Sequence, residues 1–306
     1  MEKIASFGAC TGPVGRHFGI GESMRLDKFL SDMGVGSRSE VKKNIRWGKV
    51  LVAGKAVRDP GFQVETGDEI LYKKQPVRYE AMQYYMLHKP NGVISASEDK
   101  KQTTVVDLIR DQAGNVRKDL FPVGRLDKDT EGLLIITNDG ALAHQLLAPK
   151  HHIDKVYYAQ VSGEITEADQ KAFEEGIVFD EERKAMPAGL RILKTGLPMT
   201  PALRDRFLDV VLPIRGRDIA EEAAQEEARR SLTIPDSYSE VEITIQEGKF
   251  HQVKKMVQAL GNGKRVLYLR RISMGEITLD PTRAPGEYRL LTEEELAKLK
   301  GYVKEQ

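Results

Sequence analysis

An acidic turn directly ahead of an apolar run is the part of this sequence best suited to chemistry. Asp127, Asp129 and Glu131 alternate with other residues, and the apolar run 133–136 follows at once. Three interpretations are open. The acids could form a solvated loop that keeps the apolar run from pairing with other chains, they could bind calcium, or one of them could act as an enzymatic nucleophile.

The calcium interpretation matches only part of its pattern. Four residues from Asp127 to Gly132 fall at the first, third, fifth and sixth positions of an EF-hand loop. At the twelfth position, Asn138 stands where that loop needs a bidentate glutamate. Pro122 and Gly124 ahead of the turn leave no incoming helix. A calcium loop is therefore not expected.

The residues around Asp127 resemble a known catalytic motif. Residues 124–127 read Gly-Arg-Leu-Asp, and Gly-Leu-Leu at 132–134 and Thr-Asn-Asp-Gly at 137–140 follow. This pattern resembles the catalytic motif of the pseudouridine synthases, in the branch named after the small-subunit rRNA enzyme RsuA. In that family the aspartate of the Arg-Leu-Asp triplet is the nucleophile. The resemblance implies that Asp127, and not Asp129, has this role here.

Lys155 and Tyr157 form a second candidate pair. They stand two residues apart in a stretch that predicts a strand, so their side chains should point to the same face. Residues 155–157, Lys-Val-Tyr, match the family's Lys-x-Tyr motif, in which the tyrosine stacks on the flipped base. The resemblance implies that Tyr157 covers the uracil and that Lys155 approaches a phosphate or Asp127. Tyr158 should face the opposite side, in the core.

Residues 247–256 match the family's third motif. In that motif the basic residue after His-Gln-Val sits against the catalytic aspartate, which implies that Lys254 is the partner of Asp127. Many relatives carry arginine here, and lysine offers a point charge in place of a bidentate fork. A fixed cation would oppose the protonation that burial imposes on a carboxylate. By the same resemblance, Arg125 is expected to help flip or replace the target base.

The chemistry implied by the family requires no cofactor. Pseudouridine formation breaks the bond between uracil N1 and the ribose, rotates the base and rejoins it through C5, without a redox step, a metal or a nucleotide. It requires an ionised carboxylate at the sugar carbon C1′ and an aromatic ring that holds the extruded base. His151, His152 and His251 lack acidic partners at ligand spacing, so we expect no metal site.

The length of 306 residues, the composition and the cysteine count are those expected of a globular cytoplasmic protein. Hydrophobic residues make up 40%, enough for one good core and a smaller second module. Because the net charge is only +1, attraction to RNA must come from a local basic face. The single cysteine, Cys10, excludes an internal disulfide, and no apolar run approaches the roughly 18 residues of a membrane span. We expect a monomer whose partner is ribosomal RNA, without membrane association.

Composition divides the chain into segments. The glycine-rich residues 1–23 show neither helical nor strand periodicity and read as a disordered leader. Residues 24–77 form a small module, residues 73–78 a polar linker interrupted by proline, and residues 82–303 a larger catalytic domain. Residues 194–235 fit no pattern within that domain and include a charged, alanine-rich helix. We interpret this insertion as solvated and assign it no catalytic role.

The module at 24–77 resembles the S4 RNA-binding domain. Two short helices, beginning at Leu26 and at a capping box on Ser37, precede a hairpin that turns at residues 53–54. Basic residues of the second helix recur at i, i+4 and i+8, so their charges stack along one face that suits a phosphate backbone. The expected RNA-binding residues are Arg25, Lys28, Arg38, Lys42, Lys43, Arg46, Lys49 and, in the family's Lys-Pro-x-Gly turn, Lys89.

The larger domain is predicted to be α+β, with a central, mostly antiparallel sheet. Strand-like runs alternate with helical ones, which is typical of this class. The strands are expected at 84–87, 133–137, 156–161, 241–246 and 272–279. The helices are expected at 105–111, 141–148, 167–176 and 252–260, with a last capped helix after Thr292.

The resemblance runs from residue 24 to about 303, apart from the insertion, and it also bears on the RNA target. The aromatic-His-Gln sequence at 250–252, the histidine pair 151–152 and the tail 275–289 resemble the small-subunit enzyme, which implies a uridine of 16S rRNA. Two alternative functions remain: a large-subunit rRNA synthase of the same branch, and a non-catalytic S4 protein that binds RNA during ribosome assembly. A glycoside hydrolase would need a second carboxylate, and no residue suggests itself.

Overall fold

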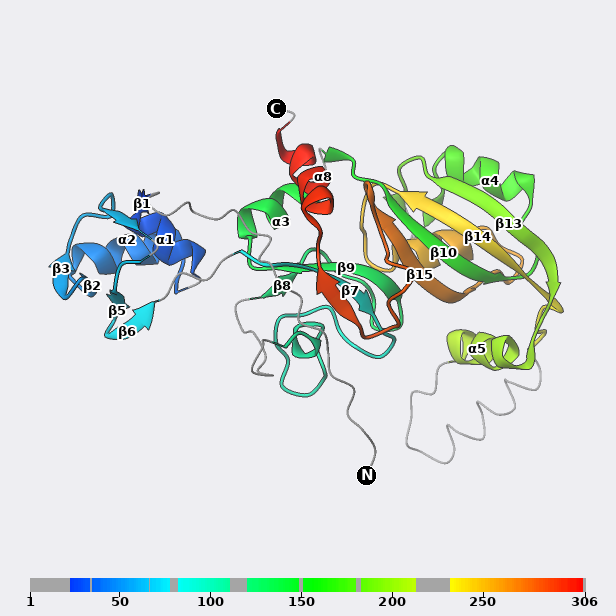
Figure 1. The fold of residues 1–306 in the computed structure, drawn as a ribbon. Coiled ribbons are helices and arrows are strands. Elements are labelled where there is room, and N and C mark those ends of the chain that lie inside the picture. The colour runs from blue at the N-terminus through cyan, green and yellow to red at the C-terminus, as the bar shows by residue number, and fades with distance from the viewer. Residues whose placement is uncertain are drawn as a thin grey trace, which may run out of the picture.

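A computed structural model (Figure 1) describes residues 23–33, 35–65, 67–77, 82–110, 120–148, 151–179, 183–212 and 232–304. Residues 1–22 of the expected leader and residues 213–231 of the insertion, with its predicted charged helix, lie outside these ranges. Ser23, which was assigned to the leader, begins strand β1. No helix of the described part is long and apolar enough to cross a membrane.

The N-terminal module contains two helices and a small antiparallel sheet. Helix α1 (Leu26–Asp32) packs on α2 (Arg38–Arg46), and Ser37 caps α2 by accepting a hydrogen bond from the Glu40 N–H at 3.3 Å. The strands are β1 (Ser23–Arg25), paired with β4 (Gln63–Glu65), and the sheet β3 (Lys55–Val57), β2 (Val50–Val52), β5 (Ile70–Tyr72) and β6 (Gln75–Val77). The module has a core of its own, and the predicted helices and hairpin are confirmed.

The prediction of a linker at 73–78 is wrong for its middle. Gln75–Val77 is strand β6, which pairs with β5 across a turn where Lys73 and Lys74 have φ of 51° and 68°. Pro76 suggested a break, yet β6 is an edge strand, where a proline leaves no ladder hydrogen bond missing.

A nine-stranded sheet forms the centre of the larger domain (Figure 1). Its main order is β13 (Gly189–Pro198), β14 (Ser237–Ile245), β10 (Lys155–Ser162), β15 (Val266–Met274), β9 (Glu131–Thr137), β7 (Tyr84–Lys89) and β17 (Tyr288–Leu290). The short strands β8 (Phe121–Pro122) and β16 (Ile277–Thr278) pair with β9 and β15. Neighbours along the order are antiparallel except β15 and β9, which are parallel. The predicted α+β class is therefore confirmed.

Both faces of this sheet are covered, and β7 and β9 are buried on both sides. One face packs with α4 (Glu167–Glu174) and α7 (Gln252–Ala259), and the other with α3 (Gly140–Leu147) and α8 (Glu293–Lys304). Successive residues of β9, such as Leu133 and Leu134, belong to opposite cores. Continuous apolar runs in the sequence follow from this double burial.

Other predictions for the larger domain held only in part. Residues 105–111 were expected to be helical. In the described part of this range, 105–110, only the 3₁₀ turn Val106–Leu108 forms and Ile109 is extended, while Asp111 lies outside the described residues. Strand β13 and helix α5 (Pro201–Val211) were missed, because β13 has a mostly exposed edge and lacks an apolar run. A short hairpin of β11 (Val178–Phe179) and β12 (Arg183–Lys184) was also missed.

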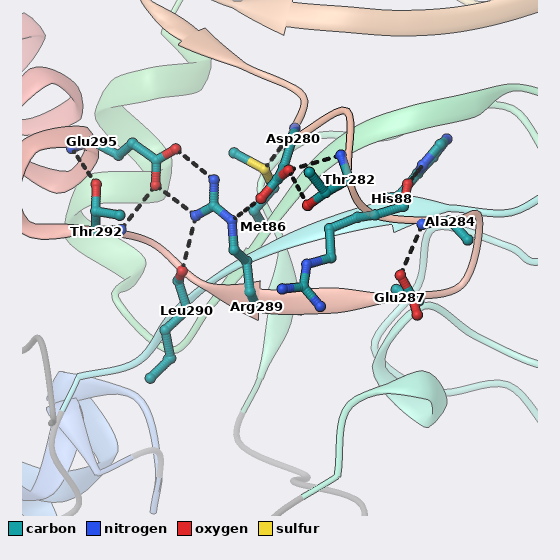
Figure 2. Close-up of polar contacts among 11 residues, drawn as sticks. Met86, His88, Asp280, Thr282, Ala284, Glu287, Arg289, Leu290, Thr292 and Glu295 are labelled. Carbon is teal, nitrogen blue, oxygen red and sulfur yellow. Dashed lines mark hydrogen bonds and ion pairs between the residues drawn. The ribbon is translucent and has the colours of Figure 1, made fainter. Parts of the chain in front are cut away.

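The C-terminal segment is fixed to the sheet by a charged network (Figure 2). Arg289 of β17 donates to Asp280 at 2.6 Å and, bidentately, to Glu295 of α8 at 2.8 Å. Hydrogen bonds from Thr282, together with Arg289, hold the pKa of Asp280 well below its usual range. The Thr292 N–H donates to the Glu295 carboxylate and the Glu295 N–H donates to the Thr292 hydroxyl, which confirms the predicted capping box. Because the pKa of Asp280 is depressed, this contribution to stability is present above the ordinary carboxyl pKa and is lost as the pH falls.

Candidate active site

Lys89 at the end of β7 holds the acidic loop, residues 125–130. Its ammonium group donates hydrogen bonds to the carbonyl oxygens of Pro90 at 3.0 Å, Lys128 at 3.1 Å and Thr130 at 2.9 Å. Burial lowers the pKa of Lys89 to about 8, against the opposing effect of nearby carboxylates. The prediction that Lys89 contacts RNA is wrong, because its side chain has no exposed surface and is engaged by its own chain.

The turn after β7 fixes the loop at two more points. The Gly92 N–H donates to the Lys128 carbonyl at 2.9 Å. The Ser95 hydroxyl donates to the Leu126 carbonyl at 2.8 Å and accepts from the Leu126 N–H at 3.1 Å. The Lys-Pro-x-Gly resemblance thus corresponds to a clamp on the backbone around Asp127.

Gly132 lets the chain leave the acidic loop against β15. Its φ is +105°, and an added Cβ would lie 2.2 Å from the Arg271 carbonyl oxygen and 2.7 Å from the Arg271 nitrogen. These residues are partners in the parallel pairing of β9 with β15. Only glycine combines this dihedral angle with so close a backbone approach.

Asp127 and Lys254 form the pair implied by the resemblance. The Lys254 ammonium, on the first turns of α7, lies 3.0 Å from Asp127 Oδ2. His251, which precedes α7 with φ of 52°, places Nε2 3.6 Å from Asp127 Oδ1. Both side chains of the ion pair are one-quarter exposed, so the pair is accessible and only partly desolvated.

Asp129 shares Lys254 with Asp127. The lysine lies 2.5 Å from Asp129 Oδ1, closer than to Asp127, and Arg206 of α5 lies 3.7 Å from Asp129 Oδ2. Burial of Asp129 favours protonation, but the hydrogen bond and charge of Lys254 and the charge of Arg206 outweigh it, so the pKa of Asp129 is lowered. The resemblance gave the role of nucleophile to Asp127 and not to Asp129, and the insertion was expected to be solvated and without a catalytic role, so these contacts of Asp129 with Lys254 and Arg206 were not anticipated.

A cleft of about 770 Å³ opens beside the acidic loop. Tyr157, Lys155 and Arg125 all line it, whereas Asp127 is not among its lining residues. The ring of Tyr157 is 7% exposed, and its cross-strand partner on β15 is Arg271, which also lines the cleft. Lys155 and Tyr157 therefore share a face, as predicted from their spacing.

Lys155, which is half-buried, and Arg271, which is buried, place two cations in the lining of this cleft. Lys155 donates to the carbonyls of Ile153 at 3.1 Å and Gln246 at 3.3 Å, and burial together with the charge of Arg271 lowers the pKa of Lys155. Arg271 is 2% exposed and donates to the Leu133 carbonyl at 2.7 Å. Lys155 does not contact Asp127 here. Arg271 was missed because an arginine within a strand carries no motif of its own.

Tyr158 points to the opposite face of β10, as predicted, but it is not in the core. Its ring is partly exposed and packs edge-on against Tyr268 at 6.1 Å between centroids, with the Arg270 guanidinium 5.5 Å away. A polar cluster therefore occupies this part of the second face, where a core position was expected.

The basic residues of the N-terminal module divide into two groups. Arg25, Arg38 and Lys42 surround Asp27, whose side chain is fully buried, at distances of 3.1, 3.7 and 3.6 Å. Burial opposes ionisation of Asp27, but Arg25 and the other cations outweigh it and lower the pKa of Asp27. These three cations keep their positive ends at the surface and are oriented by a common carboxylate. Lys28 and Arg46 are exposed.

Trp47 forms the centre of the second group. Its side chain is 58% exposed, and the ammonium groups of Lys43 and Lys49 lie 4.6 and 5.0 Å from the ring centroid. An exposed aromatic ring flanked by two cations combines a stacking surface with phosphate-binding charge. The signal in the sequence that could have identified Trp47 is its position between Lys43 and Lys49.

In the described ranges, no group of three or more His, Cys, Asp or Glu side chains is placed so that it could hold a metal ion. The reactive groups at the acidic loop are carboxylates paired with ammonium and guanidinium groups.

Comparison with known proteins places both parts of the chain among described families. The family model for RNA pseudouridylate synthase matches residues 83–259, and that for the S4 domain matches residues 24–70. An uncharacterised RNA pseudouridine synthase of Bacillus subtilis, YtzG, is 40% identical over 89% of this chain and 97% of its own length. The ribosomal small subunit pseudouridine synthase A of Vibrio cholerae is 34% identical over 90% and 99%, and that of Escherichia coli 32% over 90% and 99%.

A solved structure gives the same result for the fold. The crystal structure of a pseudouridylate synthase covers 90% of this chain and 99% of its own, with a TM-score of 0.55 and 30% sequence identity. The similarity thus extends over both the N-terminal module and the larger domain.

Proposed function

Because the chain belongs to the RNA pseudouridine synthase family and carries an S4 domain, we propose that it converts one uridine of 16S rRNA to pseudouridine, with Asp127 as the nucleophile. The observation that carries the role of Asp127 is its ion pair with Lys254 at 3.0 Å. Arg125, two residues before Asp127, lines the same cleft as Tyr157. The choice of 16S rRNA rests on similarity to relatives named as small-subunit enzymes.

The proposed reaction uses few groups. The ionised carboxylate of Asp127 attacks C1′ of the ribose, or takes part in elimination there, and the N1–C1′ bond breaks with its electron pair going to the uracil. The detached ring stays between Tyr157 and the cleft walls, rotates, and forms the C5–C1′ bond. The proton leaves C5, N1 gains one, and Asp127 is released. Tyr157 is suited to stacking on the extruded base, and Arg125 is exposed at the cleft, where it can fill the vacated place in the RNA.

Pseudouridine mapping in rRNA from cells with and without the gene tests the function. The expected result is loss of one pseudouridine from 16S rRNA and its return when the gene is restored. Loss of a site in 23S rRNA would assign the enzyme to the large subunit. An unchanged map in both rRNAs would contradict an rRNA target.

Lys254→Met is expected to move the acid limb of the pH–rate profile to higher pH. Without the ammonium group, Asp127 and Asp129 face one another with less compensating charge, and a proton on the pair becomes more favourable. Methionine keeps nearly the same length, so packing changes little. Lys254→Arg should retain substantial activity and the wild-type limb. Single-turnover rates between pH 5 and 9 provide the measurement, and identical limbs in all three proteins would remove Lys254 from this role.

Trp47→Ala is expected to weaken RNA binding by roughly tenfold, since stacking of one base on an aromatic ring contributes about 1–3 kcal/mol. Phe62→Ala is the matched control, because Phe62 is also an exposed aromatic residue of this module, at 41%, and does not belong to the Lys43–Trp47–Lys49 group. Filter binding to a 16S fragment at fixed salt measures both variants. Equal affinities for the two variants would show that Trp47 does not touch RNA.

A further inference from the structure

In the described residues of the insertion, 194–212 and 232–235, Arg206 of helix α5 reaches the acidic loop. Arg206 donates from Nε to the Leu267 carbonyl of β15 at 3.1 Å, and its Nη2 lies 3.7 Å from Asp129 Oδ2. Phe207, the next residue, is 2% exposed and anchors the helix. The guanidinium is thereby held between the sheet and the loop, although the insertion lacks any apolar run or motif that suggested such a role.

Charge around the acidic loop explains what this contact does. Asp127 and Asp129 compete for the one ammonium group of Lys254, and Asp129 is the nearer, at 2.5 Å against 3.0 Å. An unneutralised Asp129 would draw Lys254 away from Asp127 and would repel its negative charge. A second cation on the far oxygen of Asp129 reduces both effects.

We propose that Arg206 is a positioning residue for pseudouridine formation: by pairing with Asp129, it leaves Lys254 available to the nucleophile Asp127. This inference rests on the proposed role of Asp127. Helix α5 of the insertion would then support the reaction through Asp129 and Lys254, and not by touching the substrate.

Charged groups other than Lys254 and Arg206 also lie near these two carboxylates. His251 approaches Asp127 from the start of α7, at 3.6 Å. Lys89 lies beneath the loop, where its charge interacts with Asp127, Asp129 and Glu131, but its hydrogen bonds go to carbonyl oxygens. Glu131 accepts a hydrogen bond from Tyr268 at 2.7 Å. Among the contacts described, Asp129 receives ion pairs from Lys254 and Arg206.

Single-turnover kinetics of Arg206→Met across pH 5 to 9 test the inference. At the acid end we expect a loss of roughly three- to tenfold, because a partly exposed charge at this distance contributes about 1 kcal/mol. The rate should approach the wild-type value at alkaline pH. Arg206→Lys should restore most of the acid-side rate, and Arg204→Met, an exposed position on the same helix, should behave as wild type.

The Asp129→Asn background separates this role from simple packing. If Arg206 acts through Asp129, Arg206→Met has no further effect once residue 129 is neutral, so the acid-side loss disappears. The inference is overturned if Arg206→Met lowers the rate equally at every pH, if its loss persists in the Asp129→Asn background, or if its profile equals that of the wild type. Failure of the proposed function would look different, since Asp127→Asn would then match the wild-type rate.

Discussion

Asp127→Asn is expected to abolish pseudouridine formation, with a rate loss of roughly 10³-fold or more, because the amide keeps the shape of the side chain but cannot attack C1′. RNA affinity should stay within a few-fold, since the binding surfaces of the N-terminal module and the cleft are unchanged. Single-turnover assays on a 16S fragment give the rate, and filter binding gives the affinity.

Asp129→Asn is the control for this experiment. Both carboxylates share Lys254, so both variants disturb the same ion pairs, but only Asp127 is assigned to bond formation. Asp129→Asn should therefore retain turnover. An inactive Asp129→Asn beside an active Asp127→Asn would reverse the assignment and would falsify the carry-over from the family motif.

Gly132→Ala should cause the largest loss of stability among single methyl additions near the site. The substitution places a Cβ 2.2 Å from the backbone oxygen of Arg271 and forces alanine to φ of +105°. Either the pairing of β9 with β15 opens or the acidic loop shifts. The expected cost is about 3 kcal/mol or more, seen as a lower Tm, together with a large fall in rate because Asp127 moves.

Gly163→Ala separates the cost of the positive φ from the cost of the close approach to β15. Gly163 also has a positive φ, of +79°, but an added Cβ there has no atom within 4 Å. Its cost should be limited to the dihedral preference, about 1–2 kcal/mol, with activity retained. If the two variants lose equal stability, the close approach of Gly132 to β15 contributes nothing.

The sequence predicted the parts of the site that lie in continuous patterns. The strand after Asp127 follows from its apolar run, and the shared face of Lys155 and Tyr157 follows from strand alternation. The contact of Lys254 with Asp127 came from resemblance, and no local pattern places residues so distant in the chain at 3.0 Å. Their roles in the reaction stay predictions.

Other features depend on tertiary contacts that no local pattern encodes. Lys89 looked like a surface lysine, because nothing in its neighbours shows that three carbonyl oxygens surround it. Arg206 looked like one charge among many in a polar insertion, and only the docking of α5 on β15 brings it to Asp129. Pro76 suggested a linker because a proline interrupts most strands. Its strand β6 tolerates it as an edge strand, and the edge position depends on the whole sheet and not on the local sequence.

The pairing of β17 with β7 has a consequence for synthesis of the chain on the ribosome. β7 carries Lys89, which clamps the acidic loop, and its outer partner is β17, near the other end of the domain. Until residues 288–290 have emerged, that side of β7 is an open edge able to pair with another strand. The nascent domain thus exposes an unpaired strand edge until β17 has been synthesised. Arg289, with its carboxylates, then closes this edge with a short, charged strand that discourages further pairing.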